Sequence, residues 1–325
     1  MKSLWKDMLT AVLMGLVLPG VLLNVTVMLL EHPPQAALPQ ESAPRETTAQ
    51  RVSLPVRLRD SSGNVQQMDM DTYLTGVVLA EMPASFETEA LKAQAVVART
   101  YARKAYETGG KHGDGSVCGE STCCQAYLSE SDYLAKGGTL DGVSKVRSAV
   151  EATSGYVLTY EGSLIEATYF SCSGGSTEDA VAVWGTDFPY LQAVASPGEE
   201  NAVHYTDTVT FTPEQFQSTL GLSLSGTPDT WFGTTTFTEG GGVAAMTIGG
   251  QTFTGIQLRT MLGLRSTAFT ISAGADMISI TTRGYGHRVG MSQYGADAMA
   301  VTGSSFEEIL SHYYRGTTLT RLTSE

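Results

Sequence analysis

The hydrophobic pattern of the chain begins with one long apolar run near the amino terminus. Residues 8–30 carry no ionisable side chain, and at about 1.5 Å per helical residue they would reach roughly 34 Å, enough to cross a bilayer core. Lys2 and Lys6 precede the run, so the short tail would remain in the cytoplasm and the rest would be exported. Residues 1–30 are therefore expected to form a cytoplasmic tail and a transmembrane anchor.

Two features bear on whether this amino-terminal segment is cleaved. Pro19 and Gly20 resemble the break near a cleavable signal, but the apolar run is longer than a typical signal core and no small-residue cleavage site follows closely. An uncleaved anchor is the favoured interpretation. Residues 31–50 are rich in Pro, Ala, Gln, Ser and Thr, which predicts an extended linker between the membrane and the exported domain.

Short apolar patterns bounded by turn residues predict the strands of that domain. They are expected at residues 52–58, 65–69, 156–160, 163–170, 243–248, 251–253 and 277–283. Ser61–Asn64, Glu161-Gly162 and Gly249-Gly250 would connect three pairs of them as hairpins. Residues 201–263 are rich in Thr and Gly, and we interpret them as a more variable, strand-bearing lobe.

The helical patterns have recognisable ends. Asp71 is expected to cap a short apolar helix that carries Glu81 at its end and is stopped by Pro83. A second, alanine-rich helix would start at Ser85 and end before Gly109. Its many alanines predict tight packing on several sides.

Two further helices complete the expected domain. They are predicted at residues 291–301 and 304–313, and Ser304 and Glu307 have the spacing of a capping box. Residues 51–319 thus predict a single exported α+β domain with mixed and antiparallel strands and a few helices lining a groove. Residues 320–325 would form a C-terminal tail.

Composition narrows the class of function. The chain has 325 residues, of which 42% are hydrophobic, so it can build a real core and is neither disordered nor fibrous. The formal net charge is -13. Nucleic-acid binding needs a concentrated basic surface, and no such cluster occurs in the sequence, so nucleic acid is excluded as a partner.

A glycine-rich segment, Tyr285–Gly295, has the composition of a binding loop. It places His287, Ser292, Gln293 and Tyr294 between glycines, which let a ligand approach the main chain closely. Polar groups that are buried without partners are costly, so a groove that supplies partners would explain them. A plain glycine-rich turn between a strand and a helix is the alternative for this segment taken alone.

Several motifs in one order identify a family. The segments Asp71–Pro83 and Leu91–Arg103, the Ser171–Gly175 element and the glycine-rich loop together closely resemble the stage II sporulation protein D family. Members of that family are membrane-anchored lytic transglycosylases that cut peptidoglycan glycan strands during engulfment in endospore-forming bacteria. The resemblance extends from about residue 52 to residue 319.

Glu81 is the candidate catalytic residue. Its expected place, at the carboxyl end of a helix among apolar neighbours such as Leu79 and Met82, disfavours the carboxylate and should raise its pKa. A protonated carboxyl group can act as general acid and, once ionised, as base. The resemblance implies that one glutamate suffices, because the C6 hydroxyl of muramic acid supplies the nucleophile. Outside such a motif, a helix-terminal Glu is usually just solvated.

The resemblance also implies a set of substrate-binding residues. The alanine-rich helix would contribute Lys92, Gln94, Arg99 and Tyr101, and the cations would recognise the lactyl carboxylate of peptide-free glycan. Internal ion pairs are the alternative for those cations. The remaining candidates would hydrogen-bond or stack on sugars: Ser171, Ser173, Tyr285, His287, Ser292, Gln293 and Tyr294.

A cluster of soft ligands predicts a metal site. His112, Cys118 and Cys124, with Cys123 or a water molecule as a fourth ligand, have a composition that suits a structural zinc ion. The alternative is a disulfide between Cys118 and Cys123 or Cys124, which a chain outside the cytoplasm could form. Zinc is favoured, because a disulfide needs no histidine. The cluster lacks the His and carboxylate mixture of hydrolytic sites, which disfavours a zinc amidase.

The expected setting follows from the family. The anchor would hold the domain on the extracytoplasmic side of the mother-cell membrane, facing the intermembrane space. The expected partners are the glycan strands, an engulfment amidase that removes their stem peptides, and a polytopic membrane scaffold protein. A non-catalytic glycan-binding protein that enhances a cell-wall amidase is the rival function, because some relatives with this domain are thought to act in that way.

Overall fold

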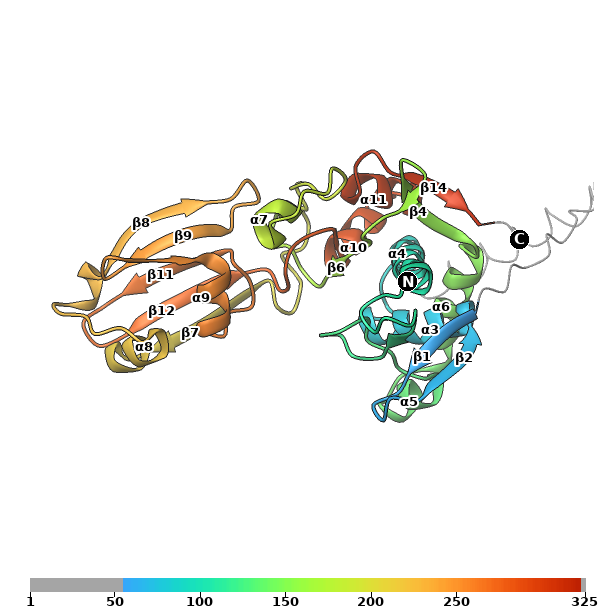
Figure 1. The fold of residues 1–325 in the computed structure, drawn as a ribbon, viewed down its shortest axis with the longest axis horizontal. Helices are drawn as coiled ribbons and strands as arrows, with labels where there is room; N and C mark the ends of the chain where they lie inside the picture. Colours follow the sequence, from blue (N-terminus) through green and yellow to red (C-terminus); the bar gives the residue numbers. More distant parts are fainter. Residues whose placement is uncertain (1–54, 323–325) are drawn as a thin grey trace, which may run out of the picture. The chain divides into compact units, whose positions relative to one another are not determined.

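An alanine-rich helix, α4 (Thr88–Thr108), lies among four other helices of the described chain (Figure 1). The computed structural model describes residues 55–322, and the predicted transmembrane helix and linker lie outside them. Helix α4 contacts α3 (Met70–Glu81), α6 (Leu140–Ala152), α10 (Gln293–Val301) and α11 (Phe306–Tyr313). It ends at Gly109, whose left-handed φ of 90° closes it as predicted.

Four helix starts differ from the prediction. Helix α4 begins at Thr88, after an N-cap at Glu87, rather than at Ser85, and α10 begins at Gln293 rather than at residue 291. The cap of α3 is Asp69 rather than Asp71, and its side chain accepts a hydrogen bond from the Thr72 amide. Ser305 rather than Ser304 caps α11, and it forms the capping box with Glu308. In α3 and α11 a neighbouring polar residue caps the helix instead of the predicted one, because more than one side chain near each start could accept the capping hydrogen bond.

The remaining elements are short. The other helices are α5 (Glu130–Ala135), α7 (Ala180–Trp184), α8 (Pro213–Leu220), η2 (Pro228–Thr230) and α9 (Gly255–Met261). The strands are β1 (Pro55–Arg59), β2 (Val65–Asp69), β3 (Val117–Cys118), β4 (Tyr156–Tyr160), β5 (Ser163–Leu164), β6 (Tyr169–Phe170), β7 (Thr206–Phe211), β8 (Phe232–Phe237), β9 (Val243–Ile248), β10 (Gln251–Thr254), β11 (Phe269–Ala273), β12 (Ile278–Arg283), β13 (Met291–Ser292) and β14 (Thr318–Arg321).

The strands form small, mainly antiparallel sheets, so the predicted α+β class is confirmed for the described residues. The orders are β2-β1-β3, β10-β9-β8, β11-β12-β7, β13-β6 and β14-β4-β5, with parallel pairs at β1-β3 and β13-β6. The Glu161-Gly162 and Gly249-Gly250 turns have positive φ at both residues and close the predicted hairpins. The strand expected at residues 163–170 is instead divided between β5 and β6.

Two hydrophobic cores organise the described chain. The larger core surrounds α4, with Leu91, Val96 and Val97 fully buried. The second core lies between β7–β12 and α8–α9, where Phe216, Ile248 and others pack together. Figure 1 shows these strands grouped apart from the helical part. In the described range, no helix combines the length and hydropathy needed to span a bilayer.

One buried ion pair links the two cores. Nη1 of Arg288 lies 3.0 Å from Oε1 of Glu178, and the two side chains are 2% and 0% exposed. The guanidinium also donates to the carbonyl oxygens of Ser173 and Gly240, which belong to segments beside the first and second core respectively. The Gly242 amide donates to Glu178 at 3.0 Å. This network fastens the glycine-rich loop to both parts of the protein.

We expect Glu178→Ala to lower the free energy of unfolding by about 3–5 kcal/mol, because Arg288 would remain buried without its counter-charge. Denaturant unfolding of the domain measures the change. Glu130→Ala, which breaks the exposed pair with Arg147, is the matched control and should change the free energy little. Equal losses in the two variants would contradict the assigned role of the buried pair.

Candidate functional site

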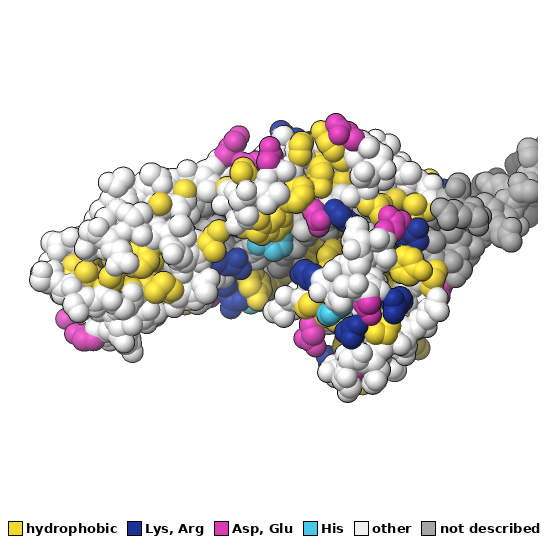
Figure 2. All heavy atoms as spheres, viewed as in Figure 1, with side chains coloured by type: hydrophobic (Ala, Val, Ile, Leu, Met, Phe, Trp, Pro, Cys, Tyr) yellow, Lys and Arg dark blue, Asp and Glu magenta, His cyan; other side chains and the backbone are white. Residues whose placement is uncertain are grey.

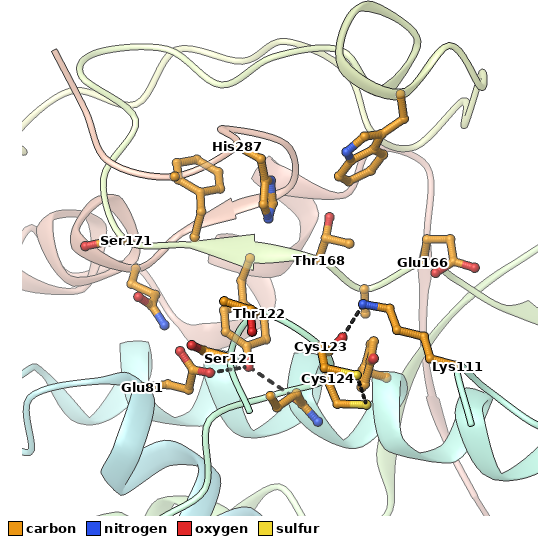
Figure 3. A pocket seen from close by; sticks show the side chains of 18 of the residues that line it. Glu81, Lys111, Ser121, Thr122, Cys123, Cys124, Glu166, Thr168, Ser171 and His287 are labelled. Atoms are coloured by element: carbon orange, nitrogen blue, oxygen red, sulfur yellow. Dashed lines mark hydrogen bonds between the residues drawn. The ribbon is translucent and has the colours of Figure 1, made fainter. Parts of the chain in front are cut away.

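A cavity of about 710 Å³ opens where the end of α3, the loop before α5, β6 and the glycine-rich loop meet (Figure 3). The predicted site residues that line it are Glu81, Tyr101, Cys123, Cys124, Ser171, Tyr285, His287 and Gln293. These residues are far apart in sequence. The fold therefore brings together the Glu81 motif, part of the cysteine cluster and the glycine-rich loop.

The glycines of the loop are required by close packing. Gly290 has a φ of 83°, and a Cβ atom there would lie 2.1 Å from the carbonyl oxygen of Thr168. Gly286 has a φ of 124° and would bring a Cβ atom within 2.7 Å of Phe170. Ser292 then caps α10 by accepting a hydrogen bond from the Gly295 amide. The loop thus turns tightly against β6 and presents His287 to the cavity.

Glu81 lies at the last position of α3, as the sequence predicts, and its side chain is half-buried in the cavity wall. Its Oε1 accepts hydrogen bonds from the Ala126 amide at 2.7 Å and from the Tyr169 hydroxyl at 3.1 Å. Burial raises the pKa of Glu81, and the bonds from Ala126, Tyr169 and Gln293 oppose that rise without cancelling it. The carboxyl group is therefore held in place and shifted towards its protonated form.

The Tyr169 hydroxyl suits both protonation states of Glu81. It lies 3.1 Å from Oε1 of Glu81 and 3.1 Å from Oε1 of Gln125, but it carries a single proton. When Glu81 is ionised, the hydroxyl can donate to it. When Glu81 is protonated, the hydroxyl can accept from it and donate to Gln125. The site can therefore stabilise the same carboxyl group as an acid and as a base.

His287 is an uncharged group at neutral pH. Burial, with a further contribution from the charge of Arg259, lowers its pKa to about 4. Its Nδ1 accepts a hydrogen bond from the Val289 amide at 3.1 Å, so Nε2 carries the proton. The ring packs against Phe170 and Trp184, with centroid distances of 5.6 Å and 5.4 Å. His287 can donate a hydrogen bond but is poorly suited to act as a base.

Aromatic side chains form much of the remaining wall. Tyr169, Phe170, Trp184, Phe188 and Tyr285 line the cavity. Trp184 and Tyr285 are 41% and 38% exposed, so parts of their surfaces are open to a ligand. Exposed aromatic faces suit sugar rings, which present apolar C–H surfaces.

Three residues predicted to bind substrate from α4 lie away from the cavity. Arg99 is 1% exposed and donates to the backbone oxygens of Thr153 and Val150, so it fastens α4 to α6. Lys92 pairs with Glu89 at 2.7 Å. Gln94 is fully buried, and its amide makes no hydrogen bond within residues 55–322. The surroundings of Arg99 match the alternative in which the cation interacts inside the protein. A direct contact with glycan does not fit its burial.

Ser173, Ser292 and Tyr294 also lie outside the cavity lining. Ser173 is buried and donates through its hydroxyl to Glu199 at 3.0 Å. Ser292 is buried as the cap of α10, and Tyr294 packs edge-on against Phe86 at 5.0 Å. The side chains of these three residues therefore make internal contacts rather than lining the cavity. Their spacing in the motif predicted proximity to the site but could not show which way each side chain points.

Other cavity residues were not predicted. Tyr169, Gln125, Trp184 and Lys111 all line the cavity. Tyr169 lies two residues before Ser171, so strand alternation, which puts both side chains on one face, could have indicated it. Gln125, Trp184 and Lys111 lie in loops or at the end of a short helix, where the sequence has no periodic signal to find them by.

The cysteine cluster forms a site that could hold a metal ion. The nearest ligand atoms of His112, Cys118, Cys123 and Cys124 all lie within 4.8 Å of one another. Nε2 of His112 lies 3.8 Å and 3.6 Å from the two sulfurs of Cys123 and Cys124, which are 3.9 Å apart. A tetrahedron of Zn–N and Zn–S bonds has edges of about 3.5–3.8 Å, so this donor set fits a soft divalent ion. All four cysteines of the described chain are free thiols.

Comparisons with known proteins agree on one family. A family model described as stage II sporulation protein matches residues 59–160. The chain is 40% identical over 277 residues to stage II sporulation protein D of Bacillus amyloliquefaciens, covering 84% of this chain and 80% of that protein. It is 40% identical over 273 residues to the protein of the same name in Bacillus subtilis, covering 83% and 79%. An amidase enhancer of Bacillus subtilis is 32% identical over 305 residues, which span 76% of this chain and 40% of that protein.

Proposed function

The chain belongs to the stage II sporulation protein D family, and on that premise we propose that it is a lytic transglycosylase of peptidoglycan. Its substrate would be peptide-free glycan strands, cut between N-acetylmuramic acid and N-acetylglucosamine during engulfment. The observation that carries the proposal is the Glu81 carboxyl group, held in the cavity wall by Ala126 and Tyr169 with a raised pKa.

The proposed reaction uses Glu81 twice. The protonated carboxyl group gives its proton to the glycosidic oxygen as the bond to C1 of muramic acid breaks. The resulting carboxylate then takes the proton of the C6 hydroxyl, whose oxygen attacks C1 and closes the 1,6-anhydro ring. Glu81 ends protonated, ready for another cycle. Tyr169 follows these changes by donating to Glu81 or to Gln125.

The carboxylates around the cavity favour this chemistry over ordinary hydrolysis. A hydrolytic glycosidase needs a second free carboxyl group as nucleophile or base. Among the described cavity-lining residues, the only other carboxylate is Glu166, which pairs with Lys104 at 2.6 Å. An internal nucleophile from the substrate removes the need for a second carboxylate. His287 would contact the sugar rings from the cavity wall, and Trp184 and Tyr285 would stack on them.

We propose zinc for the cysteine cluster, held by His112, Cys118, Cys124 and Cys123. Zinc takes four N/S ligands in structural sites, and the donor separations suit that geometry. When bound, the ion would supply a rigid tie between the loop after α4 and the segment that carries Gln125 and Ala126. Those two residues contact Tyr169 and Glu81, so the metal site would support the position of the acid.

The cellular setting is also a proposal. The apolar segment at residues 8–30 would anchor the chain in the mother-cell membrane, with the domain facing the intermembrane space. An amidase that removes stem peptides would supply peptide-free strands, and a polytopic membrane protein would recruit both proteins.

A second candidate is a non-catalytic glycan-binding protein that enhances a cell-wall amidase. The likeness to a protein named amidase enhancer favours it, although that relative is much longer than the aligned region. In this case the cavity would bind glycan without cutting it. The two functions differ in their products, because only a transglycosylase creates 1,6-anhydro ends.

We expect Glu81→Gln to lower the rate of 1,6-anhydro product formation from peptide-free strands at least about a hundredfold, because the amide cannot transfer a proton. Chromatography of the products measures this. Glutamine can still accept from Ala126 and Tyr169, so the fold should be retained. Glu166→Gln, the other carboxylate of the cavity, is the matched control and should retain activity. Wild-type protein that stimulates an amidase without making anhydro ends would favour the enhancer function instead.

The pH dependence should reveal the acid. The acidic step needs protonated Glu81, so activity should fall as the pH rises through the raised pKa. The Tyr169 hydroxyl stabilises the carboxylate, so Tyr169→Phe should raise the pKa further and move the alkaline limb of the rate profile to higher pH. Tyr160→Phe, outside the cavity, should leave the limb in place. A limb that stays fixed or moves to lower pH in Tyr169→Phe would rule out this coupling.

Metal analysis tests the cysteine cluster. We expect about one zinc ion per purified chain, because the cluster offers a full set of N/S ligands. Cys118→Ser should lose the ion. Cys172→Ser should keep it, since that buried thiol bonds to Glu199 and is separate from the cluster. Zinc-free protein with a mass that shows a disulfide at Cys118 would establish the alternative.

A further inference from the structure

A buried amide, that of Gln125, shares a hydroxyl group with Glu81. Gln125 lies in the loop before α5, lines the cavity and is 1% exposed. Its Oε1 lies 3.1 Å from the Tyr169 hydroxyl, which is also 3.1 Å from Oε1 of Glu81. Figure 3 draws these hydrogen bonds beside Glu81. Because the hydroxyl carries one proton, Glu81 and Gln125 compete for it.

The contacts of the Gln125 amide determine which end faces Tyr169. Its Nε2 donates to the Tyr73 hydroxyl at 3.2 Å and to the carbonyl oxygen of Ala98 at 3.4 Å. A carbonyl oxygen can only accept, so Nε2 lies on the Ala98 side and Oε1 on the Tyr169 side. Tyr73 is fully buried and stacks on Tyr127 at a centroid distance of 5.8 Å. This packing keeps the acceptor of Gln125 directed at Tyr169.

Oε1 of Gln125 depends on Tyr169 for its hydrogen bond. Within residues 55–322 it accepts from no other donor, and the burial of Gln125 leaves water little access to it. When Glu81 is ionised and takes the proton of Tyr169, Gln125 keeps a buried acceptor without a partner. Such an acceptor is costly. Ionisation of Glu81 therefore carries a cost that falls on its neighbour, and the protonated form is favoured.

No counter-charge in the described chain offsets that cost. Figure 2 shows Lys and Arg side chains on both sides of a recess that contains histidine, but no cation of residues 55–322 forms an ion pair with Glu81. Lys111 donates to the carbonyl oxygen of Cys123, and Glu166 pairs with Lys104. Burial and hydrogen bonds therefore decide the protonation of Glu81. The other titratable side chains of the cavity, with Tyr73 behind it, are those of Tyr101, Lys111, Cys123, Cys124, Glu166, Tyr169, Tyr285 and His287.

We propose that Gln125 is a positioning residue that competes with Glu81 for the proton of Tyr169 and so favours the protonated, proton-donating form of Glu81. The amide of Ala126, the next residue, donates to Glu81 and favours the ionised form. One loop thus supplies both influences, and Gln125 shifts the balance towards the acid. This role rests on the proposed function, since it explains how Glu81 can begin the reaction as an acid.

The first measurement is the pKa of Glu81 itself, without substrate. The full-length chain is labelled with carbon-13 at its glutamate carboxyl carbons and titrated by NMR, and Glu81→Gln assigns the signal. We expect Gln125→Met to lower the pKa of Glu81 by about one unit, because ionisation no longer leaves an acceptor without a partner. Methionine is unbranched and adapts to its surroundings. Gln125→Leu is the second variant, with the same expected shift.

Gln217→Met is the matched control. The amide of Gln217 also both donates and accepts, to the carbonyl oxygen of Pro213 and from the amide of Leu224, but it lies in α8 and outside the cavity. This substitution should leave the pKa of Glu81 unchanged.

Tyr169→Phe provides the decisive background. Once the shared hydroxyl is gone, Gln125→Met should have no further effect on the pKa of Glu81, so the two substitutions are not additive. An unchanged or raised pKa in both Gln125 variants would overturn the proposal. So would an equal decrease with and without Tyr169, since Gln125 would then act on Glu81 by another route.

The pH profile of the reaction gives a second readout. Activity falls as the pH rises through the pKa of Glu81, so Gln125→Met should move the alkaline limb about one unit to lower pH. Tyr169→Phe should move the same limb in the opposite direction. A merely structural defect would lower the rate at every pH and leave the limb in place.

The outcome is separable from that of the proposed function. If the wild-type chain makes no 1,6-anhydro ends, but Gln125→Met lowers the pKa of Glu81 only when Tyr169 is present, the enzymatic proposal fails and the role of Gln125 holds. If such ends form and require Glu81, but its pKa is the same in the wild type and both Gln125 variants, the role of Gln125 fails and the enzymatic proposal holds.

Discussion

The buried ion pair between Arg288 and Glu178 is the interaction on which the geometry of the site depends. Arg288 follows His287 directly, and its guanidinium meets carbonyl oxygens of the Ser171–Gly175 region and of the second core. Two fully buried charges are tolerated only when both are paired and hydrogen-bonded. Pairing of these two charges therefore fixes the position of the glycine-rich loop, in which His287 faces the cavity and Ser292 caps α10.

Burial also determines the protonation of Glu81. A carboxyl group in a cavity wall becomes a stronger base because burial disfavours its charge, and each hydrogen bond to the ionised form opposes that effect. Here a backbone amide fixes the oxygen, while a hydroxyl with two possible acceptors adapts to either protonation state. The arrangement suits a group that must release and recover a proton. Tyr169 is therefore as much part of the site as the acid.

The chain is similar both to stage II sporulation protein D and to an amidase enhancer, and these names refer to different roles. The fold supplies a cavity of sugar size with aromatic walls, which either function could use. What separates them is the chemistry at one carboxyl group, that of Glu81. The site should therefore be judged by its residues and their protonation rather than by the family alone.

The sequence by itself determined the local structure and the family. Residue types close together in the chain specify the C-terminal ends of α3 and α4 and the two tight hairpins. They also specify the position of Glu81 at the end of α3 and the cluster of histidine and cysteine side chains. Only the tertiary structure decided which polar side chains face the cavity. Arg99 is turned inward to α6, while Tyr169 and Lys111 line the cavity beside Glu81, which lies far from both in the sequence. The reason is physical: a motif specifies spacing along one element, whereas burial and charge pairing depend on what packs against it.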